Sequence, residues 1–190
     1  MKRRSKYETL YRKNETNGNI VIEVLLDDYL DFFHEWDNAA FKRRDIHPEL
    51  VNFLSICSED IPLKENIEIQ LCVKEGSVNK EKEDLIRTSF FNHYDTLYCW
   101  ERKEAKRIAR TSGILLLVAL TLITLYVILS GNITSSVIAQ IGMESLLIGG
   151  WVFAWEAIHG IAIDIAEPLK RRRELKRFLR ADVGFKYLNL

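Results

Sequence analysis

The chain has no excess of either charge and few cysteines. Its 190 residues include 27 lysines and arginines against 27 aspartates and glutamates. No global positive field attracts nucleic acid, so we expect no nucleic-acid partner. The three cysteines, Cys57, Cys72 and Cys99, are scattered and form no CxxC pair. This spacing is typical of reduced, mostly buried thiols in the cytoplasm and argues against a metal or redox role.

Catalytic and nucleotide-binding motifs are also missing. The loop 74–80 has neither a GxxxxGK[ST] nor a GxGxxG pattern, so we expect no nucleotide site. The chain has no HExxH motif and no Gly-x-Ser paired with a helix histidine, the patterns that mark intramembrane proteases. We therefore expect no enzymatic activity and no cofactor. The basic start of the chain is followed by polar residues, so we expect no cleavable signal peptide.

One long stretch of the chain has no charge, since no charged residue occurs between Thr111 and Met143. An apolar stretch of about 18 or more residues is the usual mark of a membrane-spanning helix, because the bilayer core is about 30 Å thick. We expect a first span over 113–130, an external hairpin over 131–136 and a second span over 137–163. Basic residues flank this pair on both sides and are absent from the hairpin. Lysine and arginine stay on the cytoplasmic side, so we expect an inner (cytoplasmic) membrane protein with both termini cytoplasmic.

The remaining residues predict a small cytoplasmic α/β domain. The fold class is therefore an α+β membrane protein, with two or three strands and helices plus a two-helix transmembrane hairpin. Residues 1–18 are polar and predict a flexible arm, and the domain follows over 19–110. Its apolar run 20–26 predicts a central strand covered on both faces. The alternating run 67–73 predicts a strand with one wetter face.

Helical patterns complete this domain. Proline fits a first helical position, so Pro48 predicts a helix that runs to about Cys57. Apolar residues at steps of three and four predict a long amphipathic helix over 81–110. Residues 168–190 predict a basic helix and a tail, and alternation after Asp182 indicates a possible third strand.

The histidines invite a metal hypothesis. Asp31 and His34 would share one face of a helix, but no second histidine stands at ligand spacing. We favour a short helix or turn whose aromatic residues pack on the sheet. His93 lies on the apolar side of the long helix, where we expect a core histidine.

Four polar residues interrupt or end the second span: Glu144, Glu156, His159 and Asp164. With 137–157 in the bilayer, Glu144 lies roughly 10 Å inside the outer boundary and Glu156 lies at the inner boundary. Glu156 and His159 could pair, carry a proton, hold a metal with a partner helix, or anchor the helix at headgroup depth. Glu144 should be protonated, bond across to Thr121 or Thr124, or face a wet cavity.

The same span has a small-residue face. At about 100° per residue, Gly142, Ser145, Gly149 and Gly160 fall near Glu156 on the helix surface. Small residues let helices approach closely, so we expect packing against the first span or a sister protomer. Seven basic residues after the span could contact anionic lipid headgroups: Lys170, Arg171, Arg172, Arg173, Lys176, Arg177 and Arg180.

The segments 42–48 and 149–157, with the aromatic tail at Phe185 and Tyr187, resemble an uncharacterised family of prokaryotic two-span membrane proteins with a small cytoplasmic α/β domain. The resemblance implies an architecture and a prokaryotic source, but no activity and no functional residue. Our first hypothesis is a non-enzymatic protein whose domain binds a protein partner or sister protomer at the membrane, as a homo-oligomer or hetero-complex. The alternative is an oligomeric membrane-permeabilising effector or small channel with Glu144 and Glu156 facing the path.

Overall fold

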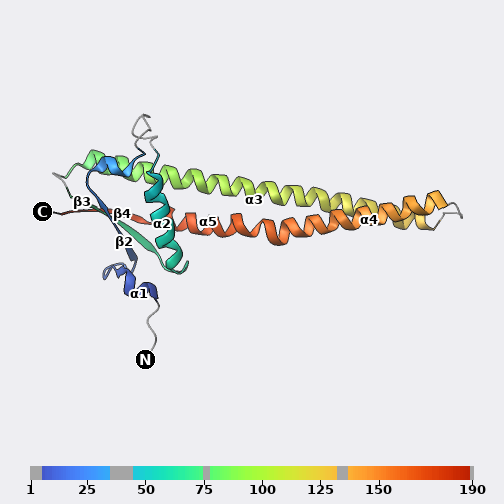
Figure 1. Cartoon of the computed structure of the whole chain (residues 1–190), viewed down its shortest axis with the longest axis horizontal. Helices are drawn as coiled ribbons and strands as arrows, with labels where there is room; N and C mark the ends of the chain where they lie inside the picture. The colour runs from blue at the N-terminus through green and yellow to red at the C-terminus, as the bar shows by residue number, and fades with distance from the viewer. Residues whose placement is uncertain (1–5, 35–44, 75–77, 132–136, 189–190) are drawn as a thin grey trace, which may run out of the picture. The chain divides into compact units, whose positions relative to one another are not determined.

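The computed structural model describes residues 6–34, 45–74, 78–131 and 137–188. The chain forms two compact units, which we call the sheet unit (Met1–Cys99 with Arg173–Leu190) and the hairpin unit (Trp100–Arg172). The elements in chain order are α1 (Lys6–Leu10), β1 (Arg12–Lys13), β2 (Ile20–Leu26), η1 (Tyr29–Phe32), α2 (Pro48–Asp60), β3 (Ile67–Val73), α3 (Lys80–Ser130), α4 (Val137–His159), η3 (Gly160–Asp164), α5 (Ala166–Leu179) and β4 (Asp182–Tyr187) (Figure 1).

The sheet unit is built on a mixed sheet with the strand order β1-β2-β3-β4. β2, β3 and β4 are parallel, so the tail after Asp182 forms the expected additional strand beside β3. β1 is antiparallel and pairs only with Ile20 and Val21. Part of the segment expected as a flexible arm is therefore α1 and β1. Tyr7 and Tyr11 of this segment pack against the core.

One face of the sheet is apolar and the other is largely polar, because side chains alternate along each strand. On the apolar face, Ile22, Ile69 and Val183 lie in register and are buried. On the other face, Glu23 is paired with Gln70 across β2 and β3, and Glu23 is exposed. The expectation that β2 is covered on both faces is therefore wrong. A short apolar run does not distinguish a doubly covered strand from one with a single buried face.

Helices α2, α3 and α5 supply much of the rest of the core, and η1 adds Tyr29 and Phe32. Leu54 of α2, Phe90 of α3 and Phe178 of α5 belong to the same buried cluster as the apolar face of the sheet. The ring of Tyr94 stacks on Phe178 with centroids 4.4 Å apart. The helix expected from Pro48 begins there, with His47 as its N-cap, and runs to Asp60.

α3 is one uninterrupted helix of 51 residues. It contains both the amphipathic helix expected over 81–110 and the apolar span expected over 113–130. Gly113 lies within the helix without breaking it, since a single glycine costs only about 1 kcal/mol relative to alanine. The second apolar segment is α4, and a π-helical turn and α5 follow it directly.

Candidate functional site

The two long helices of the hairpin unit pack through small residues. Half-buried and buried positions recur on α3 at alternating steps of four and three, and include Glu101, Ala105, Ile108, Ser112, Leu115, Ala119, Leu122 and Tyr126. Within this heptad pattern the small residues Ala105, Ser112 and Ala119 stand seven residues apart. Contacts run in opposite directions along the two helices, because Gly160 meets Ser112 whereas Gly149 meets Leu122.

Glycines on α4 and at the start of η3 allow this approach. A Cβ placed on Gly150 would lie 2.7 Å from Cγ1 of Ile123 and 3.5 Å from the Ala119 carbonyl oxygen. A Cβ on Gly160 would overlap the Ser112 hydroxyl. Ala157 lies between these two glycines and is fully buried.

The structure places two of the four expected packing residues, Gly149 and Gly160, at the contact with α3. Gly142 has open space around its Cβ position. Ser145 is exposed, and its hydroxyl donates to the Ile141 carbonyl of its own helix at 2.8 Å. The sequence interpretation missed Gly150, because the helical face was centred on Glu156 instead of being matched to the heptad pattern of α3.

A polar hollow of about 300 Å³ lies between the two helices near the end of α4. Its lining residues are Arg107, Ile108, Thr111, Ser112, Leu115, Glu156, Gly160 and Asp164. Two of the expected polar residues, Glu156 and Asp164, thus share one hollow with a basic side chain of α3. This arrangement places one cation beside two carboxylates where α4 passes into the π-helical turn.

The π-helical turn brings His159 and Asp164 together. The amide of Ile165 donates to the Gly160 carbonyl at 3.1 Å, which is the five-residue spacing of a π-helix. His159 Nδ1 then lies 3.4 Å from Asp164 Oδ2. His159 therefore has Asp164 as its close partner, where the sequence interpretation considered Glu156.

Glu144 lies on the exposed side of α4. It does not bond across to Thr121, whose hydroxyl donates instead to the Leu117 carbonyl at 2.8 Å. Among the residues that the structure describes, no hydrogen bond or ion pair joins Glu144 to another side chain. The expectation that Glu144 bonds across to Thr121 or Thr124 is therefore wrong, and the other two expectations for this carboxyl group stay predictions.

The basic residues of α5, together with Arg180 just after it, divide into exposed and buried ones. Lys170, Arg171, Arg173, Lys176 and Arg180 are exposed, and Arg172 is half-buried. Arg171 also forms an ion pair with Glu101 at 3.4 Å.

Arg177 corrects the expectation of a lipid contact. It is 7% exposed. Its guanidinium donates to the carbonyls of Ile61 and Pro62 at 2.8 and 3.1 Å, and to both oxygens of Ser58. This arginine therefore fixes the end of α2 and is not available to a headgroup.

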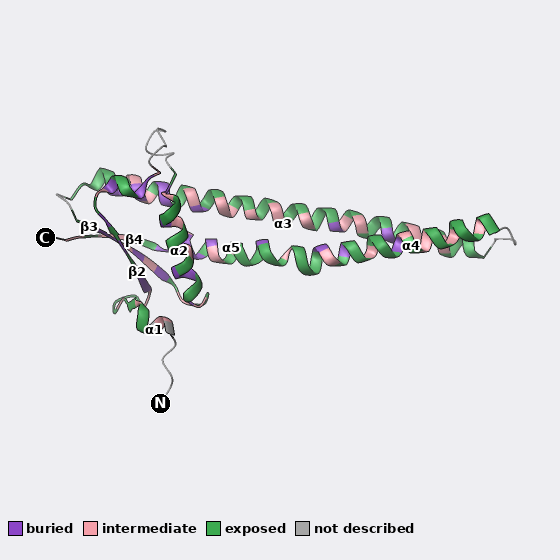
Figure 2. Ribbon diagram, in the orientation of Figure 1, coloured by how far each residue is buried: buried purple, intermediate pink, exposed green. Residues whose placement is uncertain are grey.

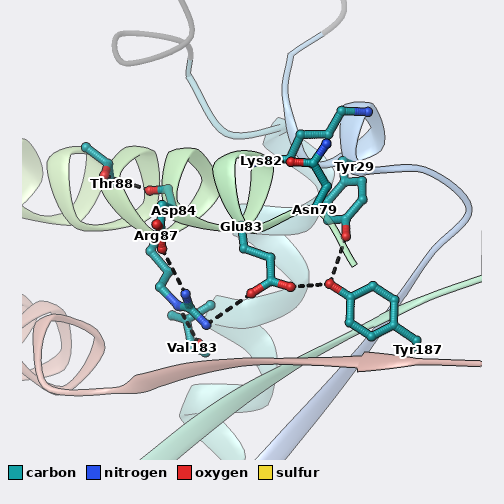
Figure 3. A network of polar contacts seen from close by, with 9 residues as sticks. All are labelled: Tyr29, Asn79, Lys82, Glu83, Asp84, Arg87, Thr88, Val183 and Tyr187. Atoms are coloured by element: carbon teal, nitrogen blue, oxygen red, sulfur yellow. Dashed lines mark hydrogen bonds and ion pairs between the residues drawn. The ribbon is translucent and has the colours of Figure 1, made fainter. Parts of the chain in front are cut away.

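The sheet unit has its own polar cluster, shown in Figure 3. The Tyr187 hydroxyl donates to Glu83 and lies 2.8 Å from the Tyr29 hydroxyl. Arg87 lies 3.5 Å from Glu83 and donates to the Val183 carbonyl at 3.1 Å. Burial and the bond to Glu83 raise the pKa of Tyr187. The cluster joins α3, β4 and η1, so its bonds support the position of the last strand.

The histidines of the sheet unit form no metal site within the described part of the chain. Asp31 accepts the amides of Asp27 and Asp28 in a capping box, which explains its place in the sequence. Burial lowers the pKa of His93, and Asp45 lies 4.0 Å from its Nδ1.

The sheet unit also has a groove of about 770 Å³, which we call the edge groove. It lies beside β2, η1 and the start of α2. Its lining residues are Glu23, Val24, Leu25, Leu26, Leu30, Asp31, Phe33, His34, His47, Glu49, Leu50 and Phe53. No feature of the sequence pointed to this groove, since its residues come from three separate segments.

We found no protein-family model that matches the chain, and no curated protein or solved structure that is significantly similar to it. The resemblance to a two-span family therefore stays a prediction.

Proposed function

We propose that this chain is a non-enzymatic protein of the cytoplasmic membrane, anchored by the α3–α4 pair, whose sheet unit binds a protein partner or a sister protomer. The observation that carries the proposal is the exposed apolar surface of the two helices. Both are long and apolar enough to cross a membrane, and only 11% and 17% of their most apolar windows are buried. A core helix of a soluble protein would be mostly buried.

The exposed side chains are large. Leu117, Ile138 and Trp155 are 66%, 82% and 69% exposed, and Figure 2 shows exposed residues along most of both helices. Contiguous apolar surface of this extent is unusual on a soluble monomer and normal against lipid.

Sheet topology supports an even number of crossings. β3 precedes the two apolar helices and β4 follows them, yet the two strands are hydrogen-bonded neighbours. The chain must therefore return to the compartment that it left. With basic residues on both flanks and none in the connection, that compartment is the cytoplasm.

Cysteine labelling tests the anchor and its orientation. Cys99 is exposed, whereas Cys57 and Cys72 are buried. An impermeant maleimide should label Cys99 only after the cells are permeabilised. Gly131→Cys in a Cys99→Ser background should be labelled in intact cells, since residue 131 is exposed at the end of α3.

The Cys99→Ser chain alone is the control and should remain unlabelled in both conditions. The protein should also stay in the membrane pellet after alkaline carbonate extraction. Release into the supernatant, or labelling of Cys99 in intact cells, would contradict the proposed anchor.

Partner binding is tested by the mass of the protein in mild detergent. We expect light scattering to give more than one chain, or a stoichiometric partner that co-purifies. A bare monomer obtained after gentle extraction would count against this half of the proposal.

Exposure of Glu144 favours a second candidate, an oligomer whose α4 helices line a gated path. A carboxyl group at that depth costs about 2.5–3.5 kcal/mol unless it meets water or another polar group. Glu144→Gln and Glu156→Gln should then change ion flux or toxicity on overexpression. Unchanged membrane potential with both variants and with the unaltered chain would remove this candidate.

A further inference from the structure

The edge groove borders a strand edge that is open. The amide of Ile20 donates to Asn66, and the carbonyl of Leu26 accepts from Lys74. The even-numbered residues of β2 therefore direct their backbone groups toward β3, and the odd-numbered residues direct theirs to the opposite side. Of these odd-numbered residues, only Val21 is paired with β1. In the part of the chain that the structure describes, no strand pairs with that side of Glu23 and Leu25.

Large apolar side chains line this open edge. Leu25, Leu30 and Phe53 are 54%, 51% and 45% exposed. Leu25 therefore combines an exposed apolar side chain with backbone groups that no described strand pairs with. Unpaired strand edges with apolar side chains beside them are templates for an added strand.

The charge of the edge groove indicates which kind of partner segment it favours. Among the residues that the structure describes, its lining includes the carboxylates of Glu23, Asp31 and Glu49 and no lysine or arginine. Arg12 compensates Glu23 in part, at 3.2 Å. Two copies of this groove would bring like charges together, so the charge favours a basic segment over a symmetric pairing of two chains.

We propose that the edge groove binds an extended segment of a partner protein, one that carries basic and apolar residues and adds to β2 as an edge strand. The backbone of the segment pairs with Glu23 and Leu25. Its apolar side chains pack against Leu30 and Phe53, and its basic side chains lie near the carboxylates. This inference rests on the proposed function, because it names the place where the sheet unit holds its partner.

A defined peptide tests the groove directly. The probe is a fluorescein-labelled, acetylated heptapeptide of alternating valine and lysine, titrated with the full chain in nanodiscs and followed by fluorescence anisotropy. The same peptide with glutamate in place of lysine should bind at least tenfold more weakly, and added salt should weaken the lysine peptide.

Main-chain pairing has a separate test. Backbone N-methyl groups placed on all valines, or on all lysines, block the N–H groups along one or the other hydrogen-bonding edge of the peptide. Because a shift of one residue would turn every side chain to the other face, one N-methylated peptide should bind and the other should lose at least tenfold. Equal binding of both would overturn strand addition.

Variants of α2 locate the site. Phe53→Ala should weaken the lysine peptide roughly five- to tenfold, which corresponds to about 1–1.4 kcal/mol. Ile56→Ala is the matched control, because Ile56 is 55% exposed on the same helix and lies outside the groove. Glu49→Lys should weaken binding similarly, whereas Glu59→Lys should change it less than twofold.

The outcomes distinguish a failure of the proposed groove from a failure of the proposed membrane anchor. Equal effects of Phe53→Ala and Ile56→Ala, or no binding of the lysine peptide at about 1 mM, would overturn the groove and leave the labelling results untouched. A dimer by light scattering that Phe53→Ala dissociates would also overturn it, by assigning the edge to a second copy. Conversely, labelling of Cys99 in intact cells would overturn the orientation of the anchor and leave the peptide results untouched.

Discussion

Arg177 provides the sharpest test of the packing in the sheet unit. It stands on α5, and its guanidinium reaches the carbonyls at the end of α2, including Ser58 and Ile61. The last carbonyls of a helix lack partners within the helix and carry the negative end of its dipole. A buried cation there satisfies several acceptors at once, and burial lowers the pKa of Arg177 without removing its charge at neutral pH.

Arg177→Ala should destabilise the unit by about 3 kcal/mol. Each buried acceptor left without a donor costs about 1–3 kcal/mol, and water entering the space returns part of that cost. For a unit of roughly 100 residues, 1 kcal/mol shifts the melting temperature by about 4 °C, so the expected decrease is about 12 °C.

A thiol-reactive fluorescent maleimide reports this transition in detergent. In a Cys99→Ser background the remaining thiols, Cys57 and Cys72, are buried and react only when the core opens. Arg173→Ala is the control, since Arg173 is exposed on the same helix and should shift the melt by no more than about 2 °C. If Arg177→Ala and Arg173→Ala have the same melting temperature, the guanidinium does not hold α2 to α5, and the reasoning fails.

Three further predictions follow from burial. Gly150→Val should speed hydrogen exchange of the hairpin-unit amides several-fold, whereas Gly142→Val should not, because a Cβ on Gly150 meets α3 and a Cβ on Gly142 meets open space. Tyr187→Phe should cost about 1–2 kcal/mol in thermal unfolding, because it leaves buried Glu83 with one donor fewer. Burial lowers the pKa of His93. The unfolded chain therefore binds the extra proton, and the stability from His93 is present above about pH 6.5 and lost as the pH falls below it. His93→Gln should flatten the decrease in melting temperature between pH 7 and 5.5, as followed by intrinsic fluorescence.

Regular periodicity explains what could be predicted from the sequence. Alternation identified the strands at Ile67–Val73 and after Asp182, and the three-to-four spacing identified the start of α3. The short elements had no such signal. β1 has two residues, too few to show a period, and it forms because β2 offers an edge to pair with.

Arg177 shows why the candidate sites were harder to predict. The six basic residues on α5 and Arg180 just after it look equivalent in the sequence, and an arginine on the side opposite Leu175 is normally solvated. Its partner at Ile61 stands 116 residues earlier, a separation at which no local pattern carries information. The edge groove has the same origin, because its lining comes from segments that meet only in the folded unit.

The sheet topology also couples the two parts of the proposed function. β4 is synthesised after both apolar helices, and it completes the sheet by pairing with β3, which is synthesised before them. In the proposed membrane arrangement β4 reaches the sheet only after both spans have crossed. A chain that inserted one span would leave Val183 and Tyr187 on the far side of the membrane, and buried Glu83 would lose its donor. The sheet unit therefore becomes complete, and able to hold a partner at β2, only in correctly inserted molecules.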